Sequence, residues 1–165
     1  MNVQFGLLGP VTAWDTGGAL PLGAPRHREV LGRLLIGRGR VVPVGRLVAD
    51  LWEDEAPAGA VGAVRTFVAA LRRALEPGRP PREPSRLLVT DGPGYALRAG
   101  REAVDAWLFE DAVARAGQAP PRSAVELWDT ALAYWRGPVL ADFPAAAWAA
   151  AERARLDALR LDAVE

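Results

Sequence analysis

Hydrophobic residues alternate with polar or small ones at the start of the chain, which is the pattern of a half-buried strand. Val3, Phe5 and Leu7 fall on one face of such a strand, because side chains of an extended chain point to alternate sides. Two more short extended pieces are expected at residues 10–14 and 19–22, separated by the turn sequence DTGG. The pattern therefore predicts a small antiparallel sheet at the N-terminus.

The hydrophobic spacing then changes to that of helices, in three successive segments. Pro25 suits the first turn of the first helix, because its missing N–H would have no partner there, and the glycines of GRGR end that helix. The apolar run VVPV leads into a second helix, which the acidic residues Glu53, Asp54 and Glu55 follow. Pro57 is expected to open the third helix, which contains the sequence AVRTFVAALRRAL.

A proline-rich loop and a hairpin follow the third helix. The sequence EPGRPPREPSR holds four prolines and cannot form regular structure. The extended runs LLVT and YAL then flank the turn DGPG, which is typical of a β-hairpin. A compact three-helix unit closed by a hairpin is the winged-helix arrangement, a variant of the helix-turn-helix. We therefore predict a winged-helix domain over residues 1–99.

The rest of the chain is predicted to be helical. Ser123 is expected to cap one helix, with Glu126 completing a capping box. A further helix is expected to start near Pro144 and to run to the last residue. A helix pair of this size resembles a tetratricopeptide unit. The predicted fold class is therefore α+β: a winged helix followed by an all-α, tetratricopeptide-like segment over residues 104–165.

The last predicted helix carries an apolar stripe that needs a neighbour to cover it. Leu156, Leu159 and Ala163 form the stripe, with Leu161 and Val164 beside it. Helical repeats need neighbours to cover such faces. We therefore expect either that the natural protein continues or that this segment packs on another chain, as in a homodimer through the helical segment.

The composition limits the chemistry that the chain can perform. It has no cysteine and no lysine, and His27 is its only histidine. A thiol nucleophile, a zinc site built on cysteine, a P-loop lysine and Schiff-base chemistry are therefore excluded. The consecutive acids Glu53, Asp54 and Glu55 lack the alternating ligand spacing of a calcium loop, and no nucleophile–base pair is present. We expect no enzyme activity, no catalytic residue, no metal and no cofactor.

The formal net charge is zero, but the charge is unevenly distributed. Residues 1–99 contain 13 arginines and 9 acidic residues, whereas residues 100–165 contain 7 and 11. Such asymmetry is typical of a basic module joined to an acidic one. The N-terminus lacks the pattern of a signal peptide, and no apolar run is long enough to span a membrane. We therefore expect a soluble, cytoplasmic protein without a membrane partner.

The third helix separates into a core face and a sparsely charged opposite face. At roughly 100° per residue, its hydrophobic stripe comprises Val64, Phe67, Val68, Leu71 and Leu75. The opposite face comprises Gly62, Thr66, Ala69 and Arg73, and one border of the stripe carries Arg65 and Arg72. If this helix enters a major groove, the opposite face meets the bases and the border arginines meet phosphates.

The residue types on this helix suit DNA. Arginine can donate to guanine O6 and N7, and threonine can contact a polar base edge or a thymine methyl group. Arg79, Arg82 and Arg86 in the following loop, and Arg26 near the start of the first helix, are candidates for phosphate contacts. The alternative is an ordinary surface helix, on which arginine stems cover apolar area.

Longer strings of the sequence resemble the antibiotic-regulatory-protein (SARP) family of actinobacterial transcriptional activators. They are GRVVPVGRLVADLWEDEAPAGA, FVAALRRAL and LLVTDGPGYAL, followed by FEDAVARA, ALAYWRGPVLADF and AERARLDALRLDAVE. The resemblance runs in order along nearly the whole chain. It implies a winged helix of the response-regulator type, followed by a bacterial transcriptional activation domain that is longer in the family than the part present here.

The resemblance also implies a function and two partners. Members bind direct repeats of double-stranded DNA near promoters and recruit RNA polymerase to gene clusters for antibiotics or other secondary metabolites. The acidic loop Glu53, Asp54 and Glu55 is then a candidate contact for the polymerase, because the corresponding loop of the response-regulator type can touch it.

The third helix departs from the family on its reading face. Members commonly carry polar or basic residues where this chain has Val61, Gly62, Ala63, Ala69 and Ala70. The residues kept on this helix are Thr66, Arg72 and Arg73, and Arg65 stands where glutamine is common. Two hypotheses follow: sequence-specific DNA binding through Arg65, Thr66, Arg72 and Arg73, or an interaction module with a weakened reading helix that pairs with another regulator.

Overall fold

A computed structural model describes residues 2–164 of the chain. In chain order the elements are β1 (Gln4–Gly6), β2 (Thr12–Asp15), β3 (Gly18–Ala19), α1 (Pro25–Ile36), β4 (Val42–Pro43), α2 (Val44–Trp52), α3 (Ala60–Leu75), β5 (Leu88–Asp91), β6 (Gly94–Leu97), η1 (Arg101–Ala103), α4 (Asp105–Gln118), α5 (Pro121–Ala133), η2 (Ala147–Ala149) and α6 (Ala150–Val164). The strands form two small antiparallel sheets, with the orders β1–β2–β3 and β4–β6–β5.

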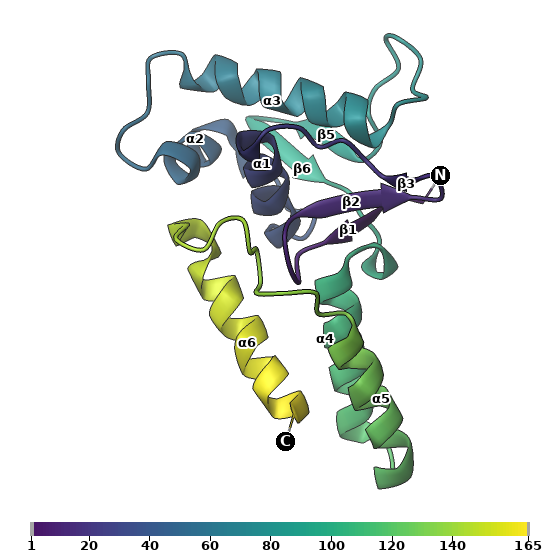
Figure 1. The fold of residues 1–165 in the computed structure, drawn as a ribbon. Helices are drawn as coiled ribbons and strands as arrows, with labels where there is room; N and C mark the ends of the chain where they lie inside the picture. The colour runs from purple at the N-terminus through teal and green to yellow at the C-terminus, as the bar shows by residue number, and fades with distance from the viewer. Residues whose placement is uncertain (1, 165) are drawn as a thin grey trace.

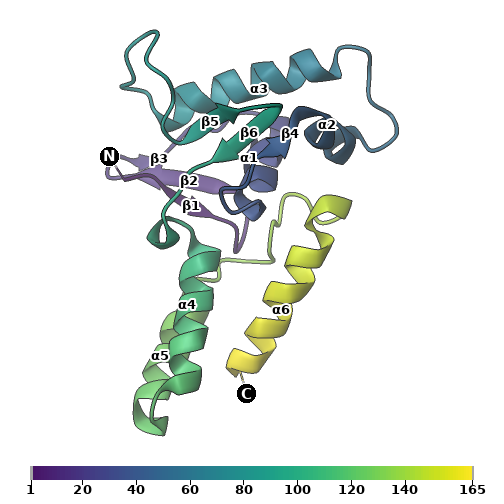
Figure 2. The ribbon, with the colours of Figure 1, turned by 180° about the vertical axis from the view of Figure 1, so that it is seen from behind.

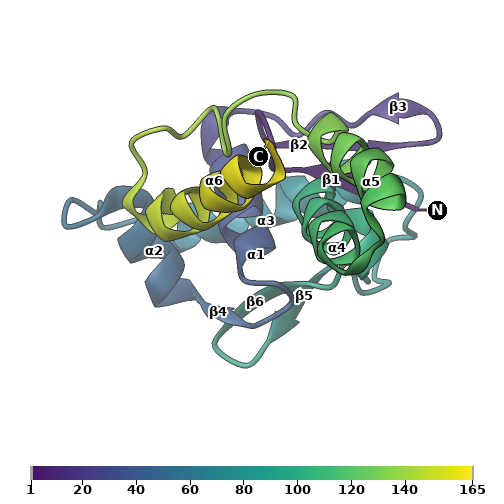
Figure 3. The same ribbon diagram turned by 90° about the horizontal axis from the view of Figure 1, so that it is seen from below.

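The helices and sheets separate into two parts, with the winged helix above and the helices α4, α5 and α6 below it in the view of Figure 1. In the first part, α3 lies across α1, α2 and the sheet of β5 and β6. In the second part, α4 and α5 form an antiparallel pair and α6 lies beside it, as the views from behind and from below show (Figures 2 and 3). The predicted fold class, a winged helix followed by an all-helical segment, is confirmed. No helix of the described range is both long and apolar enough to cross a membrane.

The run VVPV, expected only to lead into a helix, contributes Val42 and Pro43 to strand β4. Val42 pairs with Tyr95 of β6 in antiparallel register. Gly94 permits this close approach, because a Cβ at that position would lie 2.1 Å from the carbonyl oxygen of Val42. The predicted hairpin is therefore part of a three-stranded wing sheet, which ties the segment before α2 to the segment after α3.

Three predicted helix starts were wrong by a few residues. The third helix begins at Ala60 rather than at Pro57. Ser123 does not cap α5, because this helix starts earlier, with a proline in its first turn and no side-chain cap; proline suits that turn without a capping partner. The last helix begins at Ala150 rather than near Pro144, after a single 3₁₀ turn.

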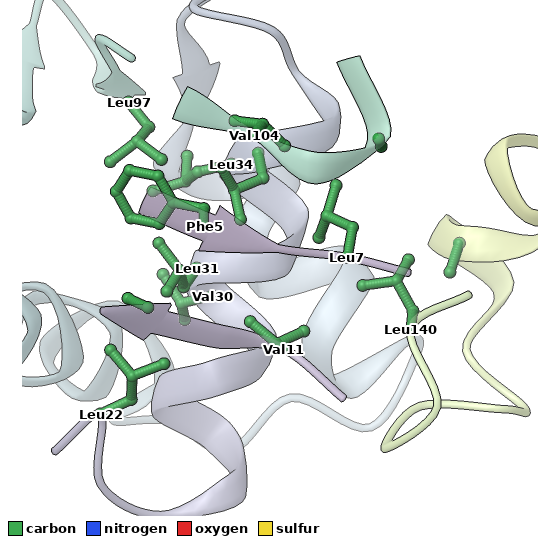
Figure 4. Packing of buried hydrophobic residues seen from close by; sticks show 14 of the residues in the cluster. Phe5, Leu7, Val11, Leu22, Val30, Leu31, Leu34, Leu97, Val104 and Leu140 are labelled. Atoms are coloured by element: carbon green, nitrogen blue, oxygen red, sulfur yellow. The ribbon is translucent and has the colours of Figure 1, made fainter. Parts of the chain in front are cut away.

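One hydrophobic core runs through both parts of the molecule (Figure 4). Its fully buried members come from β1, α1 and β6 and from the helical part alike. They include Phe5, Leu7, Leu31, Leu34, Leu97, Val104, Phe109 and Leu140. Because the second part contributes to the same core as the first, the boundary predicted between residues 99 and 104 stays a prediction.

Hydrogen bonds join the two parts along residues 7 and 8, which directly follow β1. The carbonyl oxygen of Leu7 accepts a bond from Leu140 N at 2.9 Å, and that of Leu8 accepts one from Arg136 N at 2.8 Å. The Asp105 carboxylate at the start of α4 accepts bonds from Leu7 N at 2.7 Å and from Leu8 N at 3.1 Å. Residues 7 and 8 are thus paired almost entirely with the helical part.

Asp105 gives the stability a testable pH dependence. Burial raises the pKa of Asp105, although the N–H groups of Leu7 and Leu8 and the charge on Arg136 oppose the shift. The native state therefore holds this proton to a higher pH than the unfolded chain does. Its contribution is fully present below the ordinary carboxyl pKa and is lost as pH rises through the raised value.

We therefore compare the wild type with Asp105→Asn, whose side chain does not titrate. The wild type should exceed the variant in free energy of unfolding by the largest amount at acid pH. This advantage should shrink as pH rises from the ordinary carboxyl pKa through the raised pKa of Asp105. Urea unfolding of both proteins at a series of pH values measures it. A difference that widens with rising pH would contradict the raised pKa.

Candidate nucleic-acid interface

The outer face of α3 carries the residues that the helical wheel places opposite the core. Gly62, Thr66 and Arg73 are exposed, and so is Arg65 at the border, whereas Ala69 is half-buried. Figure 1 shows α3 on the outside of the winged helix, with no other element covering that face. The geometry therefore leaves the face free to meet a groove.

The inner face of α3 holds the helix firmly against α1 and α2. Its buried residues are Val64, Val68, Leu71 and Leu75, as the predicted stripe requires. Phe67 of the same stripe is only half-buried. Its ring lies edge-on to His27 at 5.0 Å and stacks on Trp52 at 6.5 Å between centroids. These aromatic contacts fix the orientation of α3 relative to both preceding helices.

Thr66 is less versatile than its exposure alone indicates. Its hydroxyl donates to the carbonyl oxygen of Gly62 at 3.0 Å, so its proton is already used. It can still accept a hydrogen bond from a base or contact a thymine methyl group. A Cβ on Gly62 would meet nothing within 4 Å, so the core does not require a glycine there.

Arg72 lies at the border that the wheel predicts, but its side chain is engaged within the fold. Instead of extending from the helix border, its Nε donates to Leu88 O at 2.9 Å and its Nη2 to Thr90 Oγ1 at 2.8 Å. Its guanidinium also stacks 5.7 Å from the centre of the Tyr95 ring, and burial lowers its pKa. Arg72 therefore fastens α3 to the wing sheet and is not a free clamp for phosphate.

Replacing Arg72 should cost stability, whereas replacing its neighbour should not. Arg72→Ala removes both hydrogen bonds to β5, so we expect the free energy of unfolding to fall by about 1–2 kcal/mol. Arg73 is exposed and makes no hydrogen bond or ion pair to any residue in 2–164, so Arg73→Ala should change it by less than about 0.5 kcal/mol. Urea unfolding compares the two variants. Equal losses would contradict the assignment of Arg72 to the wing.

Arg26 is also occupied within the fold. It pairs with Glu29 at 2.9 Å, donates to the carbonyl oxygen of Leu51 and lies 5.0 Å from the centre of the Trp52 ring. The Arg26 guanidinium thus caps the C-terminal end of α2, where backbone carbonyl groups lack helical partners. The Nη1 of Arg26 is thus used within the fold, while its side chain stays 40% exposed, and its role as a phosphate contact stays a prediction.

The loop between α3 and β5 supplies two accessible arginines. The side chain of Arg86 is 89% exposed, with Glu83 at 4.0 Å as a distant partner, and Arg82 is exposed as well. Arg79 instead donates to the carbonyl oxygen of Glu83 and lies 3.6 Å from a Glu76 carboxylate oxygen. Arg82 and Arg86 are therefore the loop residues available to phosphates.

The acidic residues Glu53, Asp54 and Glu55 are all exposed in the loop between α2 and α3. Glu53 has a φ of 54°, a conformation that non-glycine residues rarely adopt. The loop lies at the opposite end of α3 from the arginine loop (Figure 1). A duplex bound along α3 would leave it at one edge, open to a further protein.

Comparison with known proteins identifies both parts of the chain. Residues 20–97 match the model of the family "Transcriptional regulatory protein, C terminal", and residues 104–165 match that of the "Bacterial transcriptional activator domain". Regulatory protein AfsR of Streptomyces coelicolor is 38% identical over 99% of this chain, and regulatory protein DnrI of Streptomyces peucetius is 31% identical over 99%. The chain belongs to the SARP family of transcriptional regulators. It spans 16% of AfsR and 62% of DnrI.

A solved structure and a mycobacterial relative agree with this assignment. The structure of Mycobacterium tuberculosis EmbR in complex with a low-affinity phosphopeptide matches 98% of this SARP chain and 43% of EmbR, with a TM-score of 0.87 and 32% identity. Transcriptional regulatory protein MoaR1 of Mycobacterium tuberculosis is 38% identical over 85% of this chain and 46% of MoaR1. The likeness therefore covers the winged helix and the helical part together.

Two important residues escaped the sequence reasoning. The role of Arg72 depends on its contacts with β5, and no local sequence pattern shows that β5 lies beside α3. Asp105 lies one residue after Val104 in a segment with no motif, yet it accepts bonds from residues 97 and 98 positions away. An acidic residue at the start of a helix was the available signal, and it indicates a favourable interaction with the helix dipole rather than a long-range contact.

Proposed function

We propose that this SARP chain binds promoter DNA by placing α3 in the major groove. The observation that carries the proposal is the exposed face of Thr66 and Arg73 on a helix held by α1, α2 and the wing sheet. Arg73 is the main base reader, and Thr66 is the second. Arg65 at the border contacts a phosphate, while Arg72 positions the wing.

The arginine loop extends the phosphate contacts past the end of α3. Arg82 and Arg86 are exposed there, and each phosphate that is neutralised makes the affinity more sensitive to salt. The proposed target is a pair of direct repeats near promoters of genes for antibiotics or other secondary metabolites, as in the family. The proposed location of the protein is the cytoplasm. The protein then acts as an activator.

RNA polymerase is the proposed partner of the acidic loop. Replacing Glu53, Asp54 and Glu55 by their amides keeps the shape of the loop and removes three negative charges. We expect in vitro transcription from a bound promoter to fall several-fold while the affinity for DNA stays the same or rises, since repulsion from phosphate decreases. Amide replacement of Glu126 and Asp129, exposed on α5, is the control. Unchanged transcription would contradict the contact.

A second candidate function rests on a different observation. The helical part exposes apolar side chains, with Val125 of α5 at 61% and Leu161 of α6 at 67% of full exposure. Together with the small residues on the outer face of α3, this supports an interaction module that pairs with another regulator or with a second copy. Sedimentation velocity with and without DNA distinguishes the two: a stable dimer that does not bind DNA at low salt favours the module.

A further inference from the structure

A cleft lies where the winged helix meets the helical part, away from the outer face of α3. It has a volume of about 460 Å³ and is lined by the end of α1, by β4, by α2 and by Trp148. We call it the arginine cleft because it is lined by Arg33, Arg40 and Arg46. Ligand sites commonly enclose roughly 300–1,000 Å³, so the arginine cleft has room for a small organic molecule.

The arginine cleft carries uncompensated positive charge. Asp50 is the one acidic residue among its lining residues, and it already pairs with Arg33 at 2.6 Å. Arg40 and Arg46 form no ion pair with any carboxylate of residues 2–164, and both are exposed. The cleft also includes Pro43, the N-cap residue of α2, whose first turn contains no acidic residue. The Nε of Arg40 donates to the carbonyl oxygen of Gly37 at 3.0 Å, which leaves its terminal nitrogens for a ligand. The positive end of the α2 dipole adds to the charges of Arg40 and Arg46.

Trp148 gives the cleft a flat apolar wall. Its Nε1 donates to Glu29 at 2.9 Å, and its ring lies 6.0 Å from that of Phe143. The indole also packs closely on α1, since a Cβ built on Gly32 would lie 3.3 Å from it. These contacts fix the ring, so little freedom would be lost when a second flat ring stacks on it.

The arginine cleft is separate from the proposed DNA surface. The helix α6, which follows Trp148 directly, lies on the side of α1 and α2 away from α3 (Figures 1 and 2). A duplex lying along the outer face of α3 therefore stays clear of the Trp148 wall. A ligand of the cleft would be a molecule other than the promoter.

We propose that the arginine cleft binds a small phosphorylated ligand with a flat ring, of the nucleotide class. Arg40 and Arg46 contact the phosphates, because guanidinium groups bind them through charge-assisted hydrogen bonds. Trp148 stacks on the ring of the ligand. Because the arginines come from the winged helix and Trp148 from the segment before α6, the bound ligand holds the two parts together and stabilises the native protein.

The test uses ADP as the probe in isothermal titration calorimetry on the whole chain. We expect ADP to bind with a dissociation constant below about 1 mM, at which the binding free energy is already about −4 kcal/mol, and to raise Tm. Arg40→Ala and Arg46→Ala should each weaken binding about tenfold or more. Arg122→Ala, which removes an exposed arginine of α5, should leave it unchanged. No binding at millimolar ADP, or equal affinity in all variants, would overturn the proposal.

Two further arms examine the parts of the proposed ligand. Pyrophosphate should bind more weakly than ADP, because it lacks the ring that stacks on Trp148, and equal affinity would overturn the role of the indole. Adenosine should bind more weakly than ADP too, and equal affinity would overturn the role of the arginines. Circular dichroism checks that each variant is folded. Neither arginine variant alters α3, so DNA binding without ADP should persist whether or not the cleft proposal holds.

Discussion

Asp105→Ala is expected to lower the free energy of unfolding by roughly 3–5 kcal/mol, because it leaves buried groups without partners. The carboxylate is 7% exposed and lies 3.3 Å from Nη2 of Arg136. It also accepts the N–H groups of Leu7 and Leu8. Its removal leaves both N–H groups buried and unpaired, at the point where the segment that follows β1 meets the helical part. Urea unfolding followed by circular dichroism measures the change.

A matched surface residue on the same helix serves as the control. Asp111 forms only exposed pairs with Arg101 and Arg115, at 3.5 and 3.8 Å, and surface pairs of this kind contribute about 0–1 kcal/mol. Asp111→Ala should therefore change the free energy of unfolding by less than about 1 kcal/mol. Similar losses from Asp105→Ala and Asp111→Ala would show that Asp105 is not the joint between the two parts.

Arg73→Ala is expected to weaken binding to the preferred DNA sequence by about ten- to a hundredfold and to reduce discrimination between sequences. An arginine that reads a guanine contributes about 1–3 kcal/mol of discrimination against the wrong base, and Arg73 is the one arginine at the centre of the outer face. Stability should be nearly unchanged, so the loss would not be a folding defect. Fluorescence anisotropy on the preferred duplex and on a scrambled one measures both quantities.

Arg65→Ala provides the contrast within the same helix. If Arg65 contacts a phosphate, its loss should weaken binding to both duplexes by a similar factor and reduce the salt slope by about one. Arg73→Ala should instead affect the preferred duplex more than the scrambled one. Identical behaviour of the two variants would contradict the division of α3 into a reading face and a border.

The residues of α3 show how much the sequence could predict. Helical spacing correctly separated Val64, Val68 and Leu71 from Thr66 and Arg73, because burial on a helix follows a period of 3.6 residues. The winged-helix arrangement and the helical second part followed from the same patterns. The site assignments for Arg65, Thr66 and Arg73 remain predictions, which the structure makes geometrically possible and the experiments above would test.

Long-range pairing accounts for what the sequence could not predict. The helical wheel of α3 places Arg72 at a border but cannot show that β5 lies beside it. The local sequence around Arg26 likewise cannot show that its side chain donates to the carbonyl oxygen of Leu51. The valines of VVPV favour extended structure, but the run is too short to show that Val42 and Pro43 pair with β6. Asp105 acquires its role from Leu7 and Leu8, 98 and 97 positions earlier in the chain. In each case a contact distant in sequence overrides the local pattern.

In vitro selection from a random pool of duplexes, followed by anisotropy over a range of salt concentrations, tests whether α3 reads promoter DNA. We expect the whole chain to enrich a direct-repeat sequence. Its affinity for that sequence should exceed its affinity for a scrambled duplex and should fall steeply with salt, since several arginines contact phosphates. If the chain enriches no sequence, and its binding neither depends on salt nor responds to Arg73→Ala, α3 is not a DNA-reading helix.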